Sequence, residues 1–334
     1  MWLLICFISV FSLNAQNNPS PSLVIGAESR RGTDTRLFPS LYFTDYLTRI
    51  NKQAAARPYS VPSEAELAVL AQNNADQQSI LLNNDVLAFY GHPNSQNMGI
   101  LGRHPIEELD HRLTQLAAEY NAVNEGRGVL KAFYIIYGTV WPKGDIGIIN
   151  EEKLLKYIEY AQKHDILIFL DHQIGRYNPV ESLKRMLPYL KYPHVHLALD
   201  PEWRTTKPMK EIGTVTAEEI NQAQKVMEEY LVENKLPGER LLVIHQFNWR
   251  MIQEREKVKS SFERVRLVHC ADGFGAPFLK RDSYAFNAQA VNIPVKGFKL
   301  FYNFGIPGAG YDNPLLTPKQ VFELNPRPYV IMYQ

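Results

Sequence analysis

The sequence predicts a (β/α)8 barrel preceded by a helical extension. Eight short apolar runs typical of strands alternate with longer runs whose apolar residues have helical spacing. Such alternation favours a parallel sheet, and eight strands favour its closure into a barrel. Polar residues gather directly after the strand-like runs, whose bodies are apolar. Barrels of this kind hold their catalytic residues at the carboxyl ends of the strands, so the pattern indicates an enzyme.

The strand-like runs cover residues 86–90, 130–137, 166–171, 194–200, 241–245, 265–270, 298–302 and 329–333. The helix-like runs between them cover residues 106–123, 151–163, 179–190, 217–233, 249–258, 277–289 and 318–324. Asn150 and Thr216 each precede a pair of glutamates, a pattern that caps the first free N–H groups of a helix and suits its dipole. Asn178 and Thr317 each precede a proline, which favours the first helical position.

The chain ends at Gln334, directly after the eighth strand-like run, so we expect no eighth helix. Residues 37–55 and 63–78 have helical spacing, with Pro58 and Pro62 between them. These two segments belong to an expected helical extension over residues 36–84, before a barrel domain at 85–334. We expect them to cover the face of the last strand.

Residues 2–13 form an apolar stretch that is too short to span a bilayer as a helix. A polar tract follows at once, so the stretch is interpreted as a signal peptide over residues 1–15, with a flexible leader at 16–35. The protein is therefore expected to be secreted or periplasmic. Cleavage would remove Cys6 and leave Cys270 alone, which rules out an internal disulfide.

Composition narrows the classes of partner. The 334 residues carry a formal net charge of +1, which provides no basic surface for nucleic acid. Beyond the leader, no stretch is apolar enough to cross a membrane. The sequence leaves the oligomeric state open.

Asp200 and Glu202 end the fourth strand-like run. Side chains two apart in a strand share a face, so both carboxylates are expected to point into the barrel mouth, with His196 deeper as a structural residue. The same alternation places Asp171 and Gln173 inward in the third run, and His172 outward. Paired acids at such a position indicate general acid/base chemistry, most often glycoside hydrolysis.

The predicted site is assembled from the strand ends. Its catalytic candidates are Glu202, Asp200, Asp171 and Asp272. Its candidates for substrate binding are Tyr90, His92, Gln173, Trp203, Arg204, His245, Gln246, His269, Tyr302 and Tyr333. A glycosidase needs a carboxylic acid with a raised pKa to protonate the leaving oxygen, and Glu202 has the longest reach at the mouth.

The other acids receive supporting roles. Asp200 is expected to hold the proton of Glu202 or to orient a substrate amide. Asp171 and Asp272 are candidates for the nucleophile or the base that activates water, although substrate-assisted retention would need neither. Trp203, together with the tyrosines of the binding set, is suited to stacking on sugar faces, and Arg204 to pairing with one of the acids.

The Asp-x-Glu ending of residues 197–202 resembles the fourth strand of glycoside hydrolase families 18 and 25. That resemblance implies a chitinase-like or lysozyme-like barrel in which the Glu of the motif, here Glu202, is the acid. The chain lacks the long Asp-rich signature that precedes the pair in family 18. Over residues 89–93, 199–204, 244–247 and 269–273 the barrel resembles a group of uncharacterised secreted bacterial barrel proteins, which implies a fold and a location but no substrate.

Two other functional classes fit the same residues. A divalent metal could be held by strand-end His and carboxylate groups, namely His92, Asp171, Asp200, Glu202, His245, His269 and Asp272, as in a metal-dependent hydrolase or phosphodiesterase. No tight His-x-His spacing or phosphate-binding glycine loop supports it, so we expect neither a metal nor another cofactor. A non-catalytic glycan-binding barrel would keep the aromatic residues without a raised carboxyl pKa. In either glycan class the expected partner is a carbohydrate.

Overall fold

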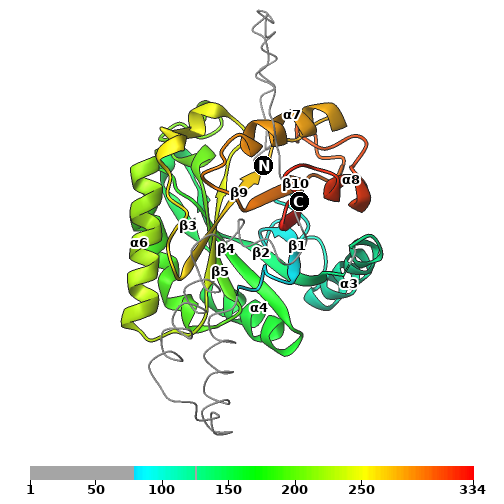
Figure 1. The fold of residues 1–334 in the computed structure, drawn as a ribbon, viewed down its shortest axis with the longest axis horizontal. Coiled ribbons are helices and arrows are strands. Elements are labelled where there is room, and N and C mark those ends of the chain that lie inside the picture. The colour runs from blue at the N-terminus through cyan, green and yellow to red at the C-terminus, as the bar shows by residue number, and fades with distance from the viewer. Residues whose placement is uncertain (1–78, 125) are drawn as a thin grey trace, which may run out of the picture.

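The computed structural model describes residues 79–124 and 126–334, which form a closed parallel barrel (Figure 1). In spatial order the barrel strands are β1 (Asn84–Gly91), β2 (Gly128–Val140), β4 (Ile166–Gln173), β5 (Val195–Asp200), β7 (Arg240–His245), β9 (Val265–Ala271), β10 (Lys296–Leu300) and β11 (Val330–Tyr333). β1 pairs in parallel with both β2 and β11, which closes the barrel. A short strand, β3 (Ile146–Ile148), adds an antiparallel hairpin to β2. The predicted (β/α)8 fold is therefore confirmed.

Helices surround the sheet, as Figure 1 shows. They are α3 (Ile106–Ala122), α4 (Glu151–Lys163), α5 (Pro179–Met186), α6 (Ala217–Glu233), α7 (Pro277–Ala288) and α8 (Pro318–Phe322), with short 3-10 turns η1 (Pro142–Gly144), η2 (Leu187–Lys191) and η3 (Pro201–Trp203). The predicted start signals are confirmed. Asn150 accepts a hydrogen bond from the Lys153 N–H, and Asn178, Thr216 and Thr317 each form a reciprocal capping box.

The helix predicted over residues 249–258 is wrong. This connection holds two 3-10 turns, η4 (Trp249–Met251) and η5 (Arg255–Lys257), on either side of a two-residue strand, β8 (Ile252–Gln253), which pairs with β6 (Val215–Thr216). Glu254 is in the left-handed region, with φ 52°. The amides of Asn221 and Asn292 bond to backbone groups of residues 255–259, so these groups are satisfied without a helical ladder.

The strand side chains divide into two packed layers. Alternate residues such as Ala88, Tyr134, Phe169 and Ala198 fill the barrel interior. Their neighbours, including the outward residues of β4 and β5, pack beneath the helices. The inward direction predicted for the third and fourth strands is therefore confirmed for their buried bodies. This alternation determines which residues reach the barrel mouth.

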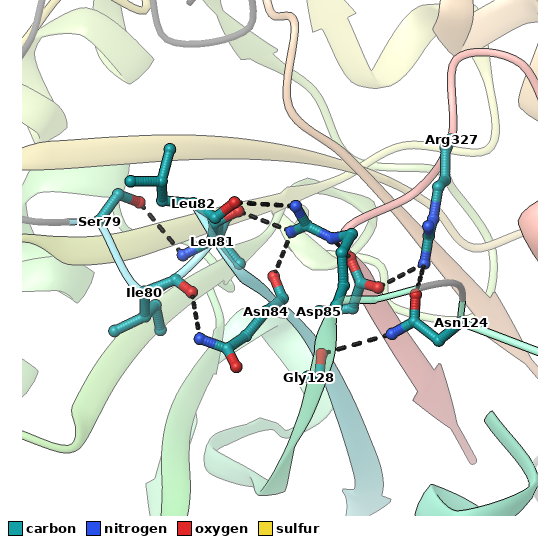
Figure 2. A network of polar contacts seen from close by, with 10 residues as sticks. Ser79, Ile80, Leu81, Leu82, Asn84, Asp85, Asn124, Gly128 and Arg327 are labelled. Atoms are coloured by element: carbon teal, nitrogen blue, oxygen red, sulfur yellow. Dashed lines mark hydrogen bonds and ion pairs between the residues drawn. The ribbon is translucent and has the colours of Figure 1, made fainter. Parts of the chain in front are cut away.

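The amino-terminal end of the barrel contains a buried polar network around Asp85, near the start of β1 (Figure 2). Nε of Arg127 donates to Asp85 Oδ1 at 3.1 Å, and Arg327 pairs with the other carboxylate oxygen. The terminal nitrogens of Arg127 also donate to three backbone carbonyls within residues 81–84. The network joins the segments before β1, β2 and β11 at the end of the barrel opposite the acids.

The predicted signal peptide, the leader at 16–35 and the helical segments 37–55 and 63–78 lie outside the described residues. Among residues 79–124 and 126–334, no helix has both the length and the apolar character needed to cross a membrane.

Candidate active site

Asp200 and Glu202 occupy the carboxyl end of β5. Asp200 is the last residue of the strand and is buried, and the chain then turns through η3, which carries Glu202. Glu202 is partly exposed, whereas Asp171, Asp200 and Asp272 are all buried. Of the four predicted acids, Glu202 is therefore the one that solvent or a substrate reaches most readily.

Burial controls the protonation of this pair. Removal from water raises the pKa of Asp200 to about 7, and the nearby Asp171 and Asp272 carboxylates add to the rise, against His245 and Lys299. Burial also raises the pKa of Glu202 well above its ordinary value, followed by the charge of Asp200. Glu202 is thus favoured in its neutral, proton-carrying form, which is the state that a general acid requires.

His245, the last residue of β7, lies between two of the carboxylates. Its Nδ1 is 3.2 Å from Asp272 Oδ2, and its Nε2 is 3.8 Å from Asp171 Oδ2 and 2.8 Å from the Tyr134 hydroxyl. Burial alone would lower the pKa of His245, but the two carboxylates together raise it well above the usual value. The site therefore contains a protonated His245 ring with a carboxylate on each side of it.

Three buried carboxylate oxygens have no hydrogen-bond partner among the described residues: Oδ1 of Asp171, of Asp200 and of Asp272. The other Asp171 oxygen accepts a hydrogen bond from the Tyr90 hydroxyl at 3.0 Å. Buried polar atoms are normally paired, so these oxygens supply acceptor positions for a proton, a water molecule or a substrate hydroxyl.

Lys299 is a member of the site that the strand-end pattern missed. It lies on β10, is 4% exposed, and its ammonium stands 3.6 Å from the centre of the Tyr90 ring. Its charge lowers the pKa of Asp171 and Glu202, against the larger effect of burial. The predicted strand ends at Tyr302, whereas β10 ends at Leu300, so the predicted strand end lies two residues too late. Tyr134 was missed because it precedes the predicted strand end.

Gln246 and His269 do not reach the mouth, which corrects their predicted place in the substrate site. His269 lies on the outer face of β9, between Leu267 and Ala271 of the outer core. Its Nε2 is 2.8 Å from Gln246 Oε1, and both residues are buried. The Gln246 backbone carbonyl accepts from Asn287 on α7. The pair supports the outer layer.

The structure also corrects the predicted roles of Arg204 and Tyr333. Arg204 pairs with Glu219 on α6, with Nη2 2.6 Å from Oε1, instead of pairing with Asp200 or Glu202. Tyr333 points outward to α3, where its hydroxyl is 2.9 Å from that of Tyr120. Neither side chain is available to a substrate in the barrel.

The remaining candidates line the rim. Gln173 uses Oε1 to accept the Val140 N–H at 2.8 Å, which joins the ends of β2 and β4. Trp203 is partly exposed in η3. Tyr302 stacks on Tyr333 at 5.2 Å between ring centres and lines a small aromatic hollow of about 60 Å³. His92 lines a separate, larger hollow. His172, as predicted, is buried on the outer side, with its ring against Tyr137.

Among the described residues, no group of three or more His, Cys, Asp or Glu side chains is arranged to hold a metal ion. Their one cysteine, Cys270, is buried inside the barrel with a free thiol.

Comparison with known proteins does not identify a family for this chain. The sequence matches no family model and no curated protein. A GH18 chitinase from Flavobacterium johnsoniae is 8% identical over 75% of this chain and 87% of its own, with a TM-score of 0.41. A chitinase from Ipomoea carnea is 11% identical over 74% and 93%, with a TM-score of 0.42. An oxaloacetate acetylhydrolase is 11% identical over 68% of this chain and 79% of its own, with a TM-score of 0.39.

Proposed function

We propose that the chain is a glycoside hydrolase in which Glu202 is the general acid. The observation that carries this proposal is the combination of exposure and protonation at Glu202. Its side chain is the accessible member of the acid cluster, and burial beside Asp200 raises its pKa. Protonation of the leaving oxygen by such a group is the step that glycosidases share.

The second role requires an ionised carboxylate. Asp272 is the better candidate, because it is 6% exposed whereas Asp171 is fully buried; Oδ1 is unpaired in both. The His245 ring lies beside it, with Nδ1 3.2 Å from Asp272 Oδ2. In this assignment Asp272 activates water or attacks the sugar, and Asp171 fixes the orientation of His245. Asp200 raises the pKa of Glu202 and offers a free oxygen to the substrate.

The proposed setting is outside the cytoplasm, because residues 2–13 have the composition of a signal-peptide core. A polysaccharide or cell-wall glycan is the substrate class that fits a secreted hydrolase.

The test is the release of reducing ends from a panel of soluble polysaccharides by the wild type and by Glu202→Gln. The proposal expects turnover by the wild type, loss of ~10²–10⁴-fold in the variant, and no effect of EDTA. Activity that EDTA abolishes and one divalent ion restores would instead establish the metal-dependent hydrolase. Glycan binding without turnover by either protein would establish the non-catalytic barrel.

A further inference from the structure

A second hollow lies at the same end of the barrel as the acid cluster. It has a volume of about 320 Å³, at the small end of the range for ligand sites. Its walls are the loop that follows β1, which carries His92, and the hairpin of β2 and β3, which carries Thr139 and Trp141. The barrel strands run in the order β1, β2, β4, β5, so the hollow after β1 and β2 and Glu202 after β5 share one rim.

Trp141 provides this hollow with an exposed aromatic side chain. The residue is 58% exposed, yet its backbone is held by the N–H bond to the Asp145 carbonyl at 2.7 Å. The indole lies against Gly147, where any Cβ would come within 2.1 Å of Trp141 Nε1. Gly147 in turn pairs with Thr139 across the hairpin. An exposed indole that packs against the hairpin backbone is suited to stacking on the C–H face of a pyranose ring.

Polar groups of the hollow are left ready to bind hydroxyls. His92 Nδ1 accepts the Asn94 N–H at 3.1 Å, which leaves the proton of the neutral ring on Nε2 as a donor. Asn150 uses Oδ1 to cap α4, which leaves its NH₂ group free of that bond. The Thr139 hydroxyl is buried and has no hydrogen-bond partner among the described residues. A buried hydroxyl without a partner is costly unless a ligand or water satisfies it.

The walls of the hollow are uncharged. None of the lining residues is Asp, Glu, Lys or Arg, and burial lowers the pKa of His92, which keeps its ring neutral. A phosphate, sulfate or uronate would find no countercharge there. Amide, hydroxyl and imidazole groups beside an indole match the hydroxyls and apolar face of a neutral sugar.

We propose that this hollow is a subsite for a neutral sugar unit of an extended glycan, with Trp141 as its platform and Thr139 as a hydrogen-bonding group. The inference rests on the proposed glycosidase function and adds a substrate class to it, namely neutral chains longer than the unit that is cleaved. With neighbouring strands about 4.8 Å apart, the hollow lies roughly 10–15 Å around the rim from Glu202, which suits a remote unit of the same chain.

The experiment separates binding from turnover. Full-length Glu202→Gln protein is titrated calorimetrically with soluble hexasaccharides of glucose, mannose, xylose, N-acetylglucosamine and, as an anionic comparison, galacturonic acid. Trp141→Ala and Thr139→Val are added to that background. Trp249→Ala is the matched control, because Trp249 is 65% exposed in η4 but does not line the hollow. Unchanged melting temperatures verify folding in each variant.

The subsite predicts that a neutral hexasaccharide binds and that Trp141→Ala weakens it about 10-fold. Thr139→Val should weaken it to a smaller extent, and Trp249→Ala should leave it unchanged. Equal affinities in Trp141→Ala and Trp249→Ala, a preference for the galacturonate chain, or binding of no member of the panel would each overturn the inference.

Hydrolysis by the wild type keeps the two proposals apart. Binding that depends on Trp141 in a protein without turnover would retain the subsite and remove the hydrolase. Turnover of long chains that is unaffected by Trp141→Ala would retain the hydrolase and remove the subsite.

Discussion

Nδ1 of His245, the last residue of β7, lies 3.2 Å from Oδ2 of Asp272. The other ring nitrogen faces Asp171, so one imidazolium lies between two carboxylates. This arrangement allows several acids to share a buried site, because the cation offsets part of their mutual repulsion. It leaves Glu202, farther out, as the acid favoured in its neutral form.

Replacing His245 by Gln removes this cation while keeping a polar side chain. His245 lowers the pKa of Asp171 and Asp200, so without it the site holds protons more strongly and the acidic limb of kcat/KM should move to higher pH. The check is a pH–rate profile on a soluble glycan. His164→Gln, at a partly exposed histidine on the outer surface, is the control and should keep the wild-type profile. An unmoved acidic limb in His245→Gln would mean that the imidazolium does not control the base.

Asp200→Asn tests the electrostatic cost of the site. Burial raises the folded-state pKa of Asp200 to about 7, whereas the unfolded chain ionises near 4. Ionising Asp200 inside the folded barrel costs free energy, so the stability of the wild type falls as pH rises from about 4 through 7. The Asn variant should therefore be more stable than the wild type at pH 8 and show little difference at pH 4. Each kcal/mol corresponds to roughly 2–4 °C in Tm for a domain of this size. Thermal unfolding of both proteins at pH 8 and pH 4 checks this. The same Tm difference between variant and wild type at the two pH values would contradict the raised pKa.

Lys299→Met should shift the alkaline limb of activity. The ammonium lowers the pKa of Glu202, so its removal should raise that pKa and extend activity to higher pH. Asp200→Asn should move the same limb in the opposite direction, because the charge of Asp200 raises the pKa of Glu202. Lys299→Arg keeps the charge and is the matched control. Shifts of the same sign in the Met and Asn variants would be inconsistent with Glu202 as the titrating acid.

Arg127→Met should destabilise the fold without changing the chemistry. It removes a buried partner of Asp85 at the amino-terminal end of the barrel, together with bonds to three carbonyls. Breaking a buried pair costs about 3–5 kcal/mol. The exposed pair of Arg112 with Glu108 provides a control, and Arg112→Met should cost about 1 kcal/mol or less. Denaturant unfolding gives both values. A matching loss in the two variants would show that burial of the network contributes nothing.

The strand order and the inward face of β4 and β5 are predictable because both follow from local patterns. Alternation of apolar residues is a property of a few consecutive positions, and that alternation is enough to place Asp171 and Asp200 inside the barrel, where both are buried. The polar endings of the strands likewise indicate the end of the barrel at which Asp200 and Glu202 lie.

The pairing within the site is less accessible to prediction. Contact between His245 and its two carboxylates depends on the relative register of β4, β7 and β9 around the closed barrel, which no single segment encodes. The prediction misses Lys299 because it ends the strand at Tyr302, two residues after the end of β10. The segment 249–258 has helical spacing, but side-chain amides from Asn221 and Asn292 bond its backbone in another conformation.

The most direct test of the central claim compares leaving groups in Glu202→Gln. The substitution keeps the shape of the side chain and removes its titratable proton. If Glu202 is the general acid, turnover of an unactivated glycan should fall ~10²–10⁴-fold, because its leaving oxygen needs the proton. An activated aryl glycoside of the same sugar should lose far less, since its leaving group departs without one. Equal loss on both substrates, or near-full turnover of the glycan by Glu202→Gln, would contradict the assignment and transfer the acid role to another carboxyl of the cluster.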